Sequence, residues 1–379
     1  MKKIKIKSSY LTPFGRLDHD LVSIALEAVR GVLSDVDIKR VRHVYIASYA
    51  PAELCRLPNP FGQIRRAFQK EYPGLTTRYH GLFKTGGEAL HTALEEMRAT
   101  ASNDPGHVLI VGVEKMTHLP PAETAGILSQ RENPHDRAYG ATLPALGALA
   151  TRSYLRTHGI PETPLHSVAV KNHKNGSQNP KAHFRRPVTL DDVASSPLVA
   201  DPLRRLHCAP TSDGAAALLL DTLEGEVWYR GWGKGTDTPL FQDRDDIGRF
   251  AATAKASDVA WRQSHVTPED IDVVEIHDAF TSFELINLEE MGFFEMGDAW
   301  KALEAGELEI NGKLAVNSSG GMKAKGHPIG TTGISSSAEI HDQLTGKAGP
   351  RQHENARLGM VQSVGGVSDE SFVFILDSC

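Results

Sequence analysis

The 379-residue sequence predicts an α/β fold made of two similar halves. Short, almost wholly apolar stretches alternate along the chain with longer segments of helical periodicity, as in sheets that helices cover on both faces. The order of these segments in the first half recurs in the second, which indicates an internal duplication. We therefore expect one half over residues 1–225 and the other over residues 226–379.

The apolar stretches predict buried strands, because aliphatic side chains run through them with little polar alternation. They cover residues 43–48, 107–113, 215–220, 226–231, 271–276, 359–361 and 371–376. Residues 1–7 instead alternate lysine with apolar side chains, which predicts an edge strand.

Amphipathic periodicity predicts helices at residues 20–33, 86–97 and 250–264. Two further helices are expected at residues 279–291 and 334–344, each directly after a polar motif. In both halves a helix leads into a strand, and a Gly-Gly pair later precedes another helix. These pairs are Gly86-Gly87 and Gly320-Gly321.

Residues 117–202 interrupt this repeat and are rich in His, Pro, Asn and Arg. A long insertion in a compact fold tends to carry function rather than to act as a linker. We expect this excursion, together with a loop over residues 57–77, to shape a substrate pocket.

Composition excludes several classes of protein. Lys and Arg number 41 against 47 Asp and Glu, a net charge of −6, which argues against a nucleic-acid-binding protein. No apolar run approaches the roughly 20 residues that cross a bilayer. The three cysteines, Cys55, Cys208 and Cys379, form no CxxC pair, which argues against a disulfide framework and against a Cys-rich zinc site. We expect a cytoplasmic protein without a bound metal.

The densest chemical signal is residues 317–333, where five glycines and a proline surround His327. Glycines let the backbone approach a ligand closely, and the next helix begins directly after this segment. A histidine held beside a helix N-terminus can donate a hydrogen bond to an oxyanion. The alternative interpretation is a glycine-rich turn with an incidental histidine.

A second signal, His277 and Asp278, follows the strand at residues 271–276. Ligands collect at the carboxyl ends of strands in α/β sheets, so polar groups there are candidates for a site. Asp278 could fix the tautomer of His277 or raise its pKa. Alternatively, Asp278 caps the helix that follows.

These motifs resemble those of the thiolase superfamily. Residues 317–333 are similar to its NxSGG-x-x-x-GHPxGxTG signature, and residues 277–280 (HDAF) resemble the HDCF motif of its sterol-carrier-protein-type branch. Further similar segments follow in the family's order at residues 12–16, 112–117, 171–182 and 208–217. The resemblance therefore spans nearly the whole chain.

The resemblance implies a fold of two βαβαβαββ halves stacked in five layers, with a loop domain inserted in the first half. It also implies a dimer or tetramer, an acyl-CoA substrate and no permanently bound cofactor. One oxyanion hole of the family would use His327 with His277, and a second would use backbone N–H groups that include Gly365. Relatives of this branch often associate with a small protein that carries a zinc ribbon and an OB-fold, so such a partner is expected.

The sequence departs from the family at its cysteines. Phe83 stands where the resemblance places the nucleophilic cysteine, and it cannot form a thioester. Ala279 and Ser363 occupy the two positions at which relatives carry the acid/base cysteine. Ser363 could act as a weak hydroxyl donor, and Phe83 could fill the nucleophile pocket with apolar bulk.

The remaining candidates are expected to bind the substrate or to support the fold. Lys84 could contact a CoA phosphate or an acyl carboxylate, or lie free in solvent. Binding of substrate or CoA is also predicted at Asn317, Gly320 and Gly321. Cys208 and Cys55 are weaker candidates for a substitute nucleophile, and Cys208 resembles a cysteine that relatives have without using it so.

Three functions stay open from the sequence. The first is an acyltransferase-like enzyme, or the thiolase-like subunit of one, that makes or breaks a C–C bond in an acyl-CoA through a thioester enolate without a Cys acyl-enzyme. The second is a retro-aldol lyase of a β-hydroxyacyl-CoA, although such lyases usually replace the histidine motifs that this chain keeps. The third is a non-catalytic scaffold subunit with the same fold.

Overall fold

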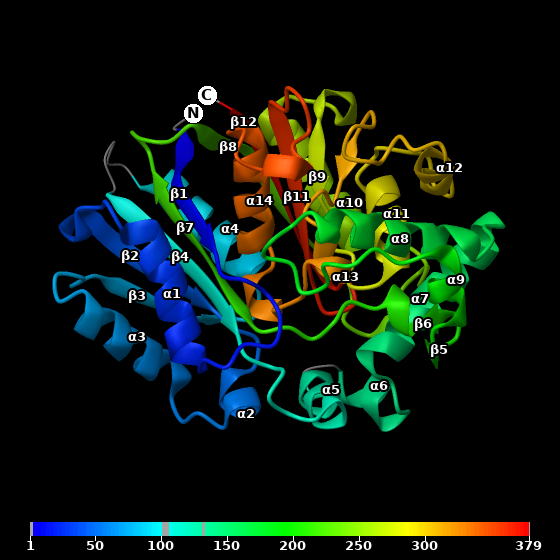
Figure 1. Cartoon of the computed structure of the whole chain (residues 1–379), viewed down its shortest axis with the longest axis horizontal. Coiled ribbons are helices and arrows are strands. Elements are labelled where there is room, and N and C mark those ends of the chain that lie inside the picture. The colour runs from blue at the N-terminus through cyan, green and yellow to red at the C-terminus, as the bar shows by residue number, and fades with distance from the viewer. Residues whose placement is uncertain (1–2, 101–105, 131–132, 379) are drawn as a thin grey trace.

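A computed structural model describes residues 3–100, 106–130 and 133–378, and a ten-stranded sheet runs through the molecule (Figure 1). The strand order is β10-β9-β11-β12-β8-β1-β7-β4-β2-β3. The first five strands along the chain in this sheet are β1 (Ile4–Leu11), β2 (Val41–Ala47), β3 (Arg78–Phe83), β4 (His107–Glu114) and β7 (Gly214–Asp221). The others are β8 (Val227–Thr236), β9 (Val273–Glu275), β10 (Ala315–Val316), β11 (Leu358–Gly365) and β12 (Glu370–Ser378).

The sheet displays the duplication directly. In the first half β2 pairs in parallel with β3 and β4, whereas β7 pairs antiparallel with β4 and β1. In the second half β9 pairs in parallel with β10 and β11, whereas β12 pairs antiparallel with β11 and β8. The two halves meet where β1 pairs antiparallel with β8. The predicted α/β fold with two similar halves is confirmed.

Helices form three further layers around the two halves of the sheet (Figure 1). Helices α1 (Leu21–Leu33) and α3 (Pro60–Glu71) cover the outer face of the first half. Helices α10 (Ala251–Ser264) and α11 (Thr281–Glu290) cover the outer face of the second. Helices α4 (Gly86–Ala99) and α14 (Ile334–Leu344) lie between the halves and share one apolar core with strands of both. This arrangement gives the five layers that the resemblance implies.

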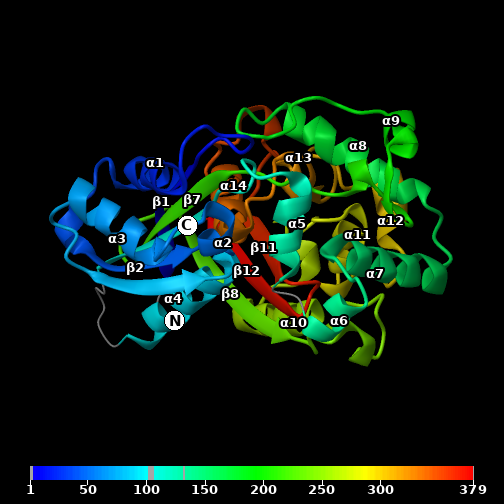
Figure 2. The ribbon, with the colours of Figure 1, turned by 90° about the horizontal axis from the view of Figure 1, so that it is seen from below.

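The excursion at residues 117–202 is largely helical. It contains α5 (Pro121–Ser129), α6 (Pro134–Ala138), α7 (Leu143–His158), α8 (Thr163–Ser177) and α9 (Leu190–Ser195), and a small ribbon of β5 (Leu198–Ala200) and β6 (Leu203–Arg204) follows. Figure 2 shows these helices gathered on the side of the second half, near α10 and α11. The short helices α2 (Pro51–Cys55), α12 (Ala299–Glu304) and α13 (Gly321–Ala324) complete the set of α-helices among the described residues.

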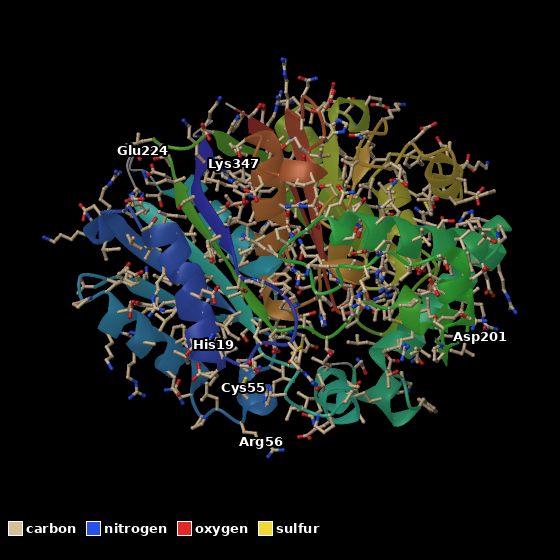
Figure 3. The ribbon with its side chains drawn as sticks, in the orientation of Figure 1. His19, Cys55, Arg56, Asp201, Glu224 and Lys347 are labelled. Atoms are coloured by element: carbon tan, nitrogen blue, oxygen red, sulfur yellow. The ribbon has the colours of Figure 1, made fainter. Side chains whose placement is uncertain are left out.

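The prediction of an N-terminal edge strand is wrong. Strand β1 lies in the middle of the sheet, between β7 and β8, and Ile4 and Ile6 are completely buried. Its lysines reach the turn that joins β7 to β8, where Lys7 pairs with Glu224, labelled in Figure 3. Alternation of apolar and charged residues therefore indicates which side chains lie on each face of a strand, but it does not indicate whether the strand is at the edge or in the middle of the sheet.

Other boundaries also differ from the predictions. The expected loop at residues 57–77 contains α3, whose start is capped by Asn59 through Gly62 N–H. Strand β3 was not predicted, because its sequence RYHGLF is too polar to resemble a buried strand. Helix α14 has the predicted bounds, and α11 begins at Thr281 instead of residue 279.

Strand β8 packs unusually closely on α10 because it carries Gly231, Gly233 and Gly235 on one face. A Cβ atom on Gly231 would lie 2.6 Å from the carbonyl oxygen of Ala260. We expect Gly231→Ala to lower the free energy of unfolding by about 1–3 kcal/mol, because the helix must move away from the strand. Urea denaturation measures this loss. The matched control is Gly126→Ala in α5, where a Cβ would meet nothing within 4 Å, and it should cost nothing.

Candidate active site

A cavity of about 210 Å³ lies where the excursion meets the end of β9 and the loop before α14. Most of its lining is apolar, and the excursion supplies one wall through Pro121, Ala125, Leu128, Ser129, Thr142, Leu143 and Pro144. The residues of chemical interest on the lining are Thr85, Cys208, His277, Ala279, His327, Val364 and Gly366. Residues 117–202 thus line this cavity, as expected, whereas residues 57–77 are absent from its lining. That the cavity binds the substrate stays a prediction.

The two histidine motifs meet in this cavity. The imidazole rings of His277 and His327 lie 5.2 Å apart between centroids and are perpendicular, at 89°. His277 lies two residues after the end of β9, and His327 stands in the loop that leads into α14. Two segments fifty residues apart in the sequence thus place their imidazoles side by side, as the motifs predict.

The hydrogen bonds of His277 define its tautomer. Its Nδ1 accepts from the backbone N–H of Val364 at 3.3 Å, so the single proton of a neutral ring must sit on Nε2. Burial, together with the neighbouring His327, holds the pKa of His277 well below its usual range, so the ring is neutral at pH 7. His277 therefore offers Nε2–H as a neutral hydrogen-bond donor.

The loop around His327 is held from two sides. The backbone N–H of His327 donates to Ser212 Oγ at 3.2 Å, and Gly326, with φ of +115°, lets the chain pass this hydroxyl. The carboxylate of Glu114 accepts from Gly330 N–H at 2.9 Å and from Tyr49 N–H at 2.8 Å. Burial lowers the pKa of His327 to about 4, so this imidazole is also neutral at pH 7.

Asp278 neither fixes the tautomer of His277 nor raises its pKa, the two roles that the sequence suggested. Its carboxylate accepts from the N–H groups of Met322 and Lys323 and from Asn172 Nδ2, at 2.6, 3.3 and 2.7 Å. It does not cap α11 either, because that helix begins at Thr281. Asp278 instead ties the segment after β9 to the glycine-rich loop.

The residue that the resemblance places at the nucleophile position does not line the cavity. Phe83 ends β3 and packs into the central core, 6.0 Å from the ring of Tyr45, and it is absent from the cavity lining. Thr85, two residues later, lines the cavity and caps α4 by accepting from Glu88 N–H at 3.2 Å. The side chain that faces the site at this helix N-terminus is therefore a hydroxyl, which sequence reasoning missed.

The two acid/base positions also differ from each other. Ala279 lines the cavity and presents only a methyl group. Ser363 is completely buried against Gly87, its Oγ has no hydrogen-bond partner among the described residues, and it is absent from the lining. Val364 and Gly366, on either side of Gly365, do line the cavity, and the oxyanion role of Gly365 stays a prediction.

The predicted binding residues separate into two groups. Lys84 is exposed and lies in a shallow hollow that is also lined by Ala50, Glu53, Ile127 and Gln130. This hollow is next to the cavity, because Tyr49, Leu128 and Ser129, which adjoin Ala50, Ile127 and Gln130 in the sequence, line the cavity. Asn317, Gly320 and Gly321 are buried and absent from the lining. Asn317 accepts from Ile276 N–H and donates to Glu284, so its amide positions the loop, and binding of substrate or CoA by these three residues stays a prediction.

Comparisons with known proteins agree with this architecture. The family described as thiolase, N-terminal domain matches residues 4–224, and the family described as thiolase C-terminal domain-like matches residues 233–378. The chain belongs to the thiolase superfamily. It is 38% identical over 316 residues to an acetyl-CoA acetyltransferase of Methanothermobacter thermautotrophicus. This alignment covers 80% of this chain and 82% of that protein.

Other relatives place this thiolase-superfamily chain in the sterol-carrier-protein-type branch. It is 28% identical over an alignment of 387 residues to sterol carrier protein 2 of Rattus norvegicus, covering 94% of this chain and 68% of that protein. Among solved structures, one named Ltp2-ChsH2(DUF35) aldolase has a TM-score of 0.82 and 22% identity. That match covers 100% of this chain and 98% of the other.

The described cysteines of this thiolase-superfamily chain are poor nucleophiles. Cys208 lines the cavity, but burial raises the pKa of its thiol to about 11, and Sγ donates to the carbonyl of Arg204 at 3.4 Å. Cys55 ends α2, labelled in Figure 3, and burial raises its pKa to about 12. Cys379 lies outside the described residues. Both described thiols are therefore protonated at neutral pH.

None of the helices in the described residues has both the length and the apolar composition to span a membrane.

The low pKa of His327 predicts a pH-dependent stability. Between about pH 6.5 and pH 4 the unfolded chain protonates this histidine and the folded chain does not, so stability falls as pH falls. Relative to His327→Gln, the native chain should lose about 2 kcal/mol of unfolding free energy between pH 7.5 and pH 5. Urea denaturation of both proteins at the two pH values tests this. A difference that does not change with pH would mean that His327 takes up its proton over the same pH range in the folded and unfolded chains, and would contradict the lowered pKa.

Proposed function

We propose that the protein stabilises the enolate of a coenzyme A thioester while a C–C bond is formed or broken, without an acyl-enzyme. The observation that carries this proposal is the placement of His277. Its Nε2–H is the free donor of a neutral imidazole beside His327 in a mostly apolar cavity, and the helix N-terminus that faces this cavity carries Thr85 instead of cysteine.

The proposed chemistry depends on charge that develops on the thioester oxygen. When electrons move into the carbonyl group, this oxygen becomes an oxyanion that accepts a hydrogen bond from His277. A donor fixed in a mostly apolar cavity stabilises such charge more than water does, because it needs no reorganisation. His327, held by Ser212 and the Glu114-bound loop, is the second imidazole of this oxyanion hole.

Cleavage of a β-hydroxyacyl-CoA is the reaction that fits these residues best. Thiolysis would need a cysteine to accept the acyl group, and Thr85 is a far weaker nucleophile. In a retro-aldol step the β-hydroxyl proton passes to solvent water, the oxygen forms a carbonyl group with Cβ, and the electrons of the breaking Cα–Cβ bond form the thioester enolate. Protonation at Cα then gives a shorter acyl-CoA and a carbonyl compound. The retained histidines would stabilise this enolate.

The scaffold alternative is less well supported. It relied on Phe83 to fill the nucleophile pocket, but Phe83 packs in the core and the cavity stays open. An inert scaffold also gives no reason for two neutral imidazoles at a cavity wall.

Substrate and partners follow from the same proposal. The exposed Lys84, in a hollow next to the cavity, is suited to a CoA phosphate or an acyl carboxylate. A structure with this fold is named Ltp2-ChsH2(DUF35) aldolase, which supports a small partner protein. That the partner carries a zinc ribbon and an OB-fold is proposed on the resemblance. Self-association as a dimer or tetramer is proposed on the resemblance alone.

The function is tested with panels of β-hydroxyacyl-CoAs and of β-ketoacyl-CoAs with free CoA, analysed by mass spectrometry of the small molecules and of the intact protein. We expect cleavage of a β-hydroxyacyl-CoA, no thiolysis and no mass added to the protein. Cys208→Ser should keep the activity, because its thiol takes no part. An acyl adduct on Cys208 or Cys55 would refute the proposal, and binding of no CoA ester would favour the scaffold.

A further inference from the structure

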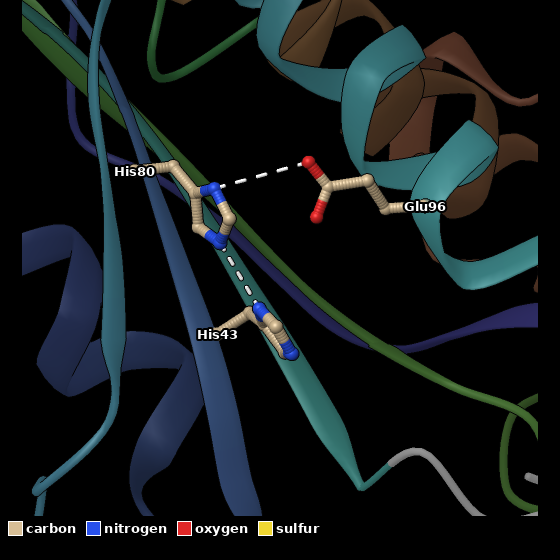
Figure 4. Close-up of side chains that lie close together, drawn as sticks. All are labelled: His43, His80 and Glu96. Carbon is tan, nitrogen blue, oxygen red and sulfur yellow. Dashed lines mark hydrogen bonds and ion pairs between the residues drawn. The ribbon is translucent and has the colours of Figure 1, made fainter. Parts of the chain in front are cut away.

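A second cluster of chemically active side chains lies in the first half, away from the cavity. His43 on β2, His80 on β3 and Glu96 on α4 converge at the outer end of the sheet (Figure 4). Helix α4 reaches both places, since Thr85 begins it at the cavity and Glu96 lies eleven residues later, about 16 Å along the axis. The proposed function uses none of the three.

The local fold brings the three side chains to one face. Strands β2 and β3 pair in parallel with Tyr45 opposite His80, and His43 stands two residues before Tyr45, hence on the same face. Helix α4 packs against β2 and β3 and adds Glu96. A single ion bound by these three side chains would connect the edge strand β3 to both β2 and α4.

The distances suit one metal ion. His43 Nδ1 and His80 Nε2 are 3.0 Å apart, and one ligand atom from each of the three residues can be chosen so that all lie within 4.8 Å of one another. The 3.9 Å contact of Glu96 Oε1 is with His80 Nδ1, the ring nitrogen that does not face His43, so the carboxylate must move closer to share an ion with the two imidazoles (Figure 4). Ligands of a tetrahedral Zn²⁺ ion, bound at about 2.0–2.1 Å, lie about 3.3 Å from one another. The two imidazole nitrogens are therefore close to the required spacing. The side chain of Glu96 is half-exposed, so its carboxylate can move toward them to complete the site.

Tyr45 supplies the outer support that metal ligands usually have. Its hydroxyl donates to Glu96 Oε2 at 2.6 Å, and its ring stacks on His80 with centroids 4.0 Å apart and planes 6° from parallel. Such contacts fix the orientation of ligands and raise the affinity of a metal site.

Charge around the cluster is mixed. Burial lowers the pKa of both His43 and His80, which keeps the imidazoles in the neutral form that binds metals. The carboxylate of Glu96 attracts a cation, whereas the exposed Arg78 disfavours one. Two neutral imidazoles and one carboxylate are a ligand set that zinc binds, with a fourth position left open.

We propose that His43, His80 and Glu96 bind a divalent transition-metal cation, Zn²⁺ or a close analogue, that fastens β3 to β2 and α4. This site is independent of the proposed enolate chemistry.

Isothermal titration of the whole chain with ZnCl₂, after removal of metal with EDTA and desalting, tests the site. We expect one tight site, which His43→Gln or His80→Gln removes and Glu96→Gln weakens at least tenfold. Tyr45→Phe keeps the stacked ring but loses the hydroxyl, and should weaken binding about 10–100-fold. His135→Gln, an exposed histidine on α6, is the matched control and should change nothing.

Absence of a tight site in the native chain would overturn the proposal, as would a site that persists in both histidine variants. If those variants do not fold, Tyr45→Phe and Glu96→Gln decide the question, because unchanged affinity in both contradicts this ligand set. Arg78→Gln should tighten binding, since it removes a competing positive charge, and weaker binding in this variant would count against the site.

Discussion

His277→Ala is expected to lower kcat by about 10²–10³-fold and to change the KM of the CoA thioester little. The donated Nε2–H strengthens only as charge develops on the thioester oxygen, so its loss falls on the transition state. The measurement is steady-state turnover of whichever β-hydroxyacyl-CoA the panel identifies. His327→Ala should produce a loss of similar size, and the double variant should lose less than the product of both, because the two imidazoles act as one unit.

The control for these variants is His135→Ala, which removes an exposed imidazole far along the chain from both motifs. Circular dichroism and thermal denaturation should confirm that each variant is folded before its kinetics are compared. Turnover of His277→Ala within a few-fold of the native protein would contradict the oxyanion role. A large rise in KM with unchanged kcat would instead assign His277 to substrate binding.

Asp213→Ala is expected to lower the free energy of unfolding by about 3–5 kcal/mol. The carboxylate is completely buried and accepts hydrogen bonds from five donors. These are the N–H groups of Leu17, Met116 and Thr117 at 3.1, 2.7 and 2.8 Å, Thr117 Oγ1 at 2.6 Å and Lys115 Nζ at 2.8 Å. Alanine would remove this acceptor from all five donors at the start of the excursion and would leave the Lys115 ammonium group with the carbonyl oxygen of Leu17 but no carboxylate.

Guanidinium denaturation followed by circular dichroism measures this loss. Asp213→Asn keeps the shape and one acceptor oxygen, so it should lose less than Asp213→Ala. Asp191→Ala, on the exposed side of α9, is the matched control and should change stability by less than about 0.5 kcal/mol. A loss below about 1 kcal/mol for Asp213→Ala would show that water replaces the carboxylate.

The sequence sufficed for the layered fold and for the pairing of His277 with His327. Aliphatic strands and helical periodicity indicate burial directly. Only the motif around His327 carries the glycines and the proline that predict a constrained loop, and the pairing with His277 followed from the resemblance to the thiolase motifs. Placement within the sheet was harder. The alternation in β1 is equally compatible with an edge strand and with the central strand observed, since only pairing with β7 and β8 decides between them.

Thr85 and the histidine cluster were missed for a different reason. Aligning the chain with the family motif placed Phe83 at the nucleophile, but side-chain direction depends on where β3 ends and α4 begins. His43 and His80 are thirty-seven residues apart and belong to no motif, so only the register of β2 against β3 brings them together. Asp278 likewise is adjacent to His277 in the sequence, but its carboxylate accepts a hydrogen bond from the loop after Gly321, which the sequence does not indicate.

Uptake of deuterium at Cα of acetyl-CoA and propionyl-CoA in D₂O, followed by mass spectrometry, tests the central claim most directly. An enzyme that stabilises a thioester enolate must accelerate this exchange in either direction of the overall reaction. We predict exchange well above the uncatalysed rate, a loss of about 10²-fold or more in His277→Ala, and no acyl group on the protein. Exchange no faster than in buffer, or equally fast in His277→Ala, would contradict the account.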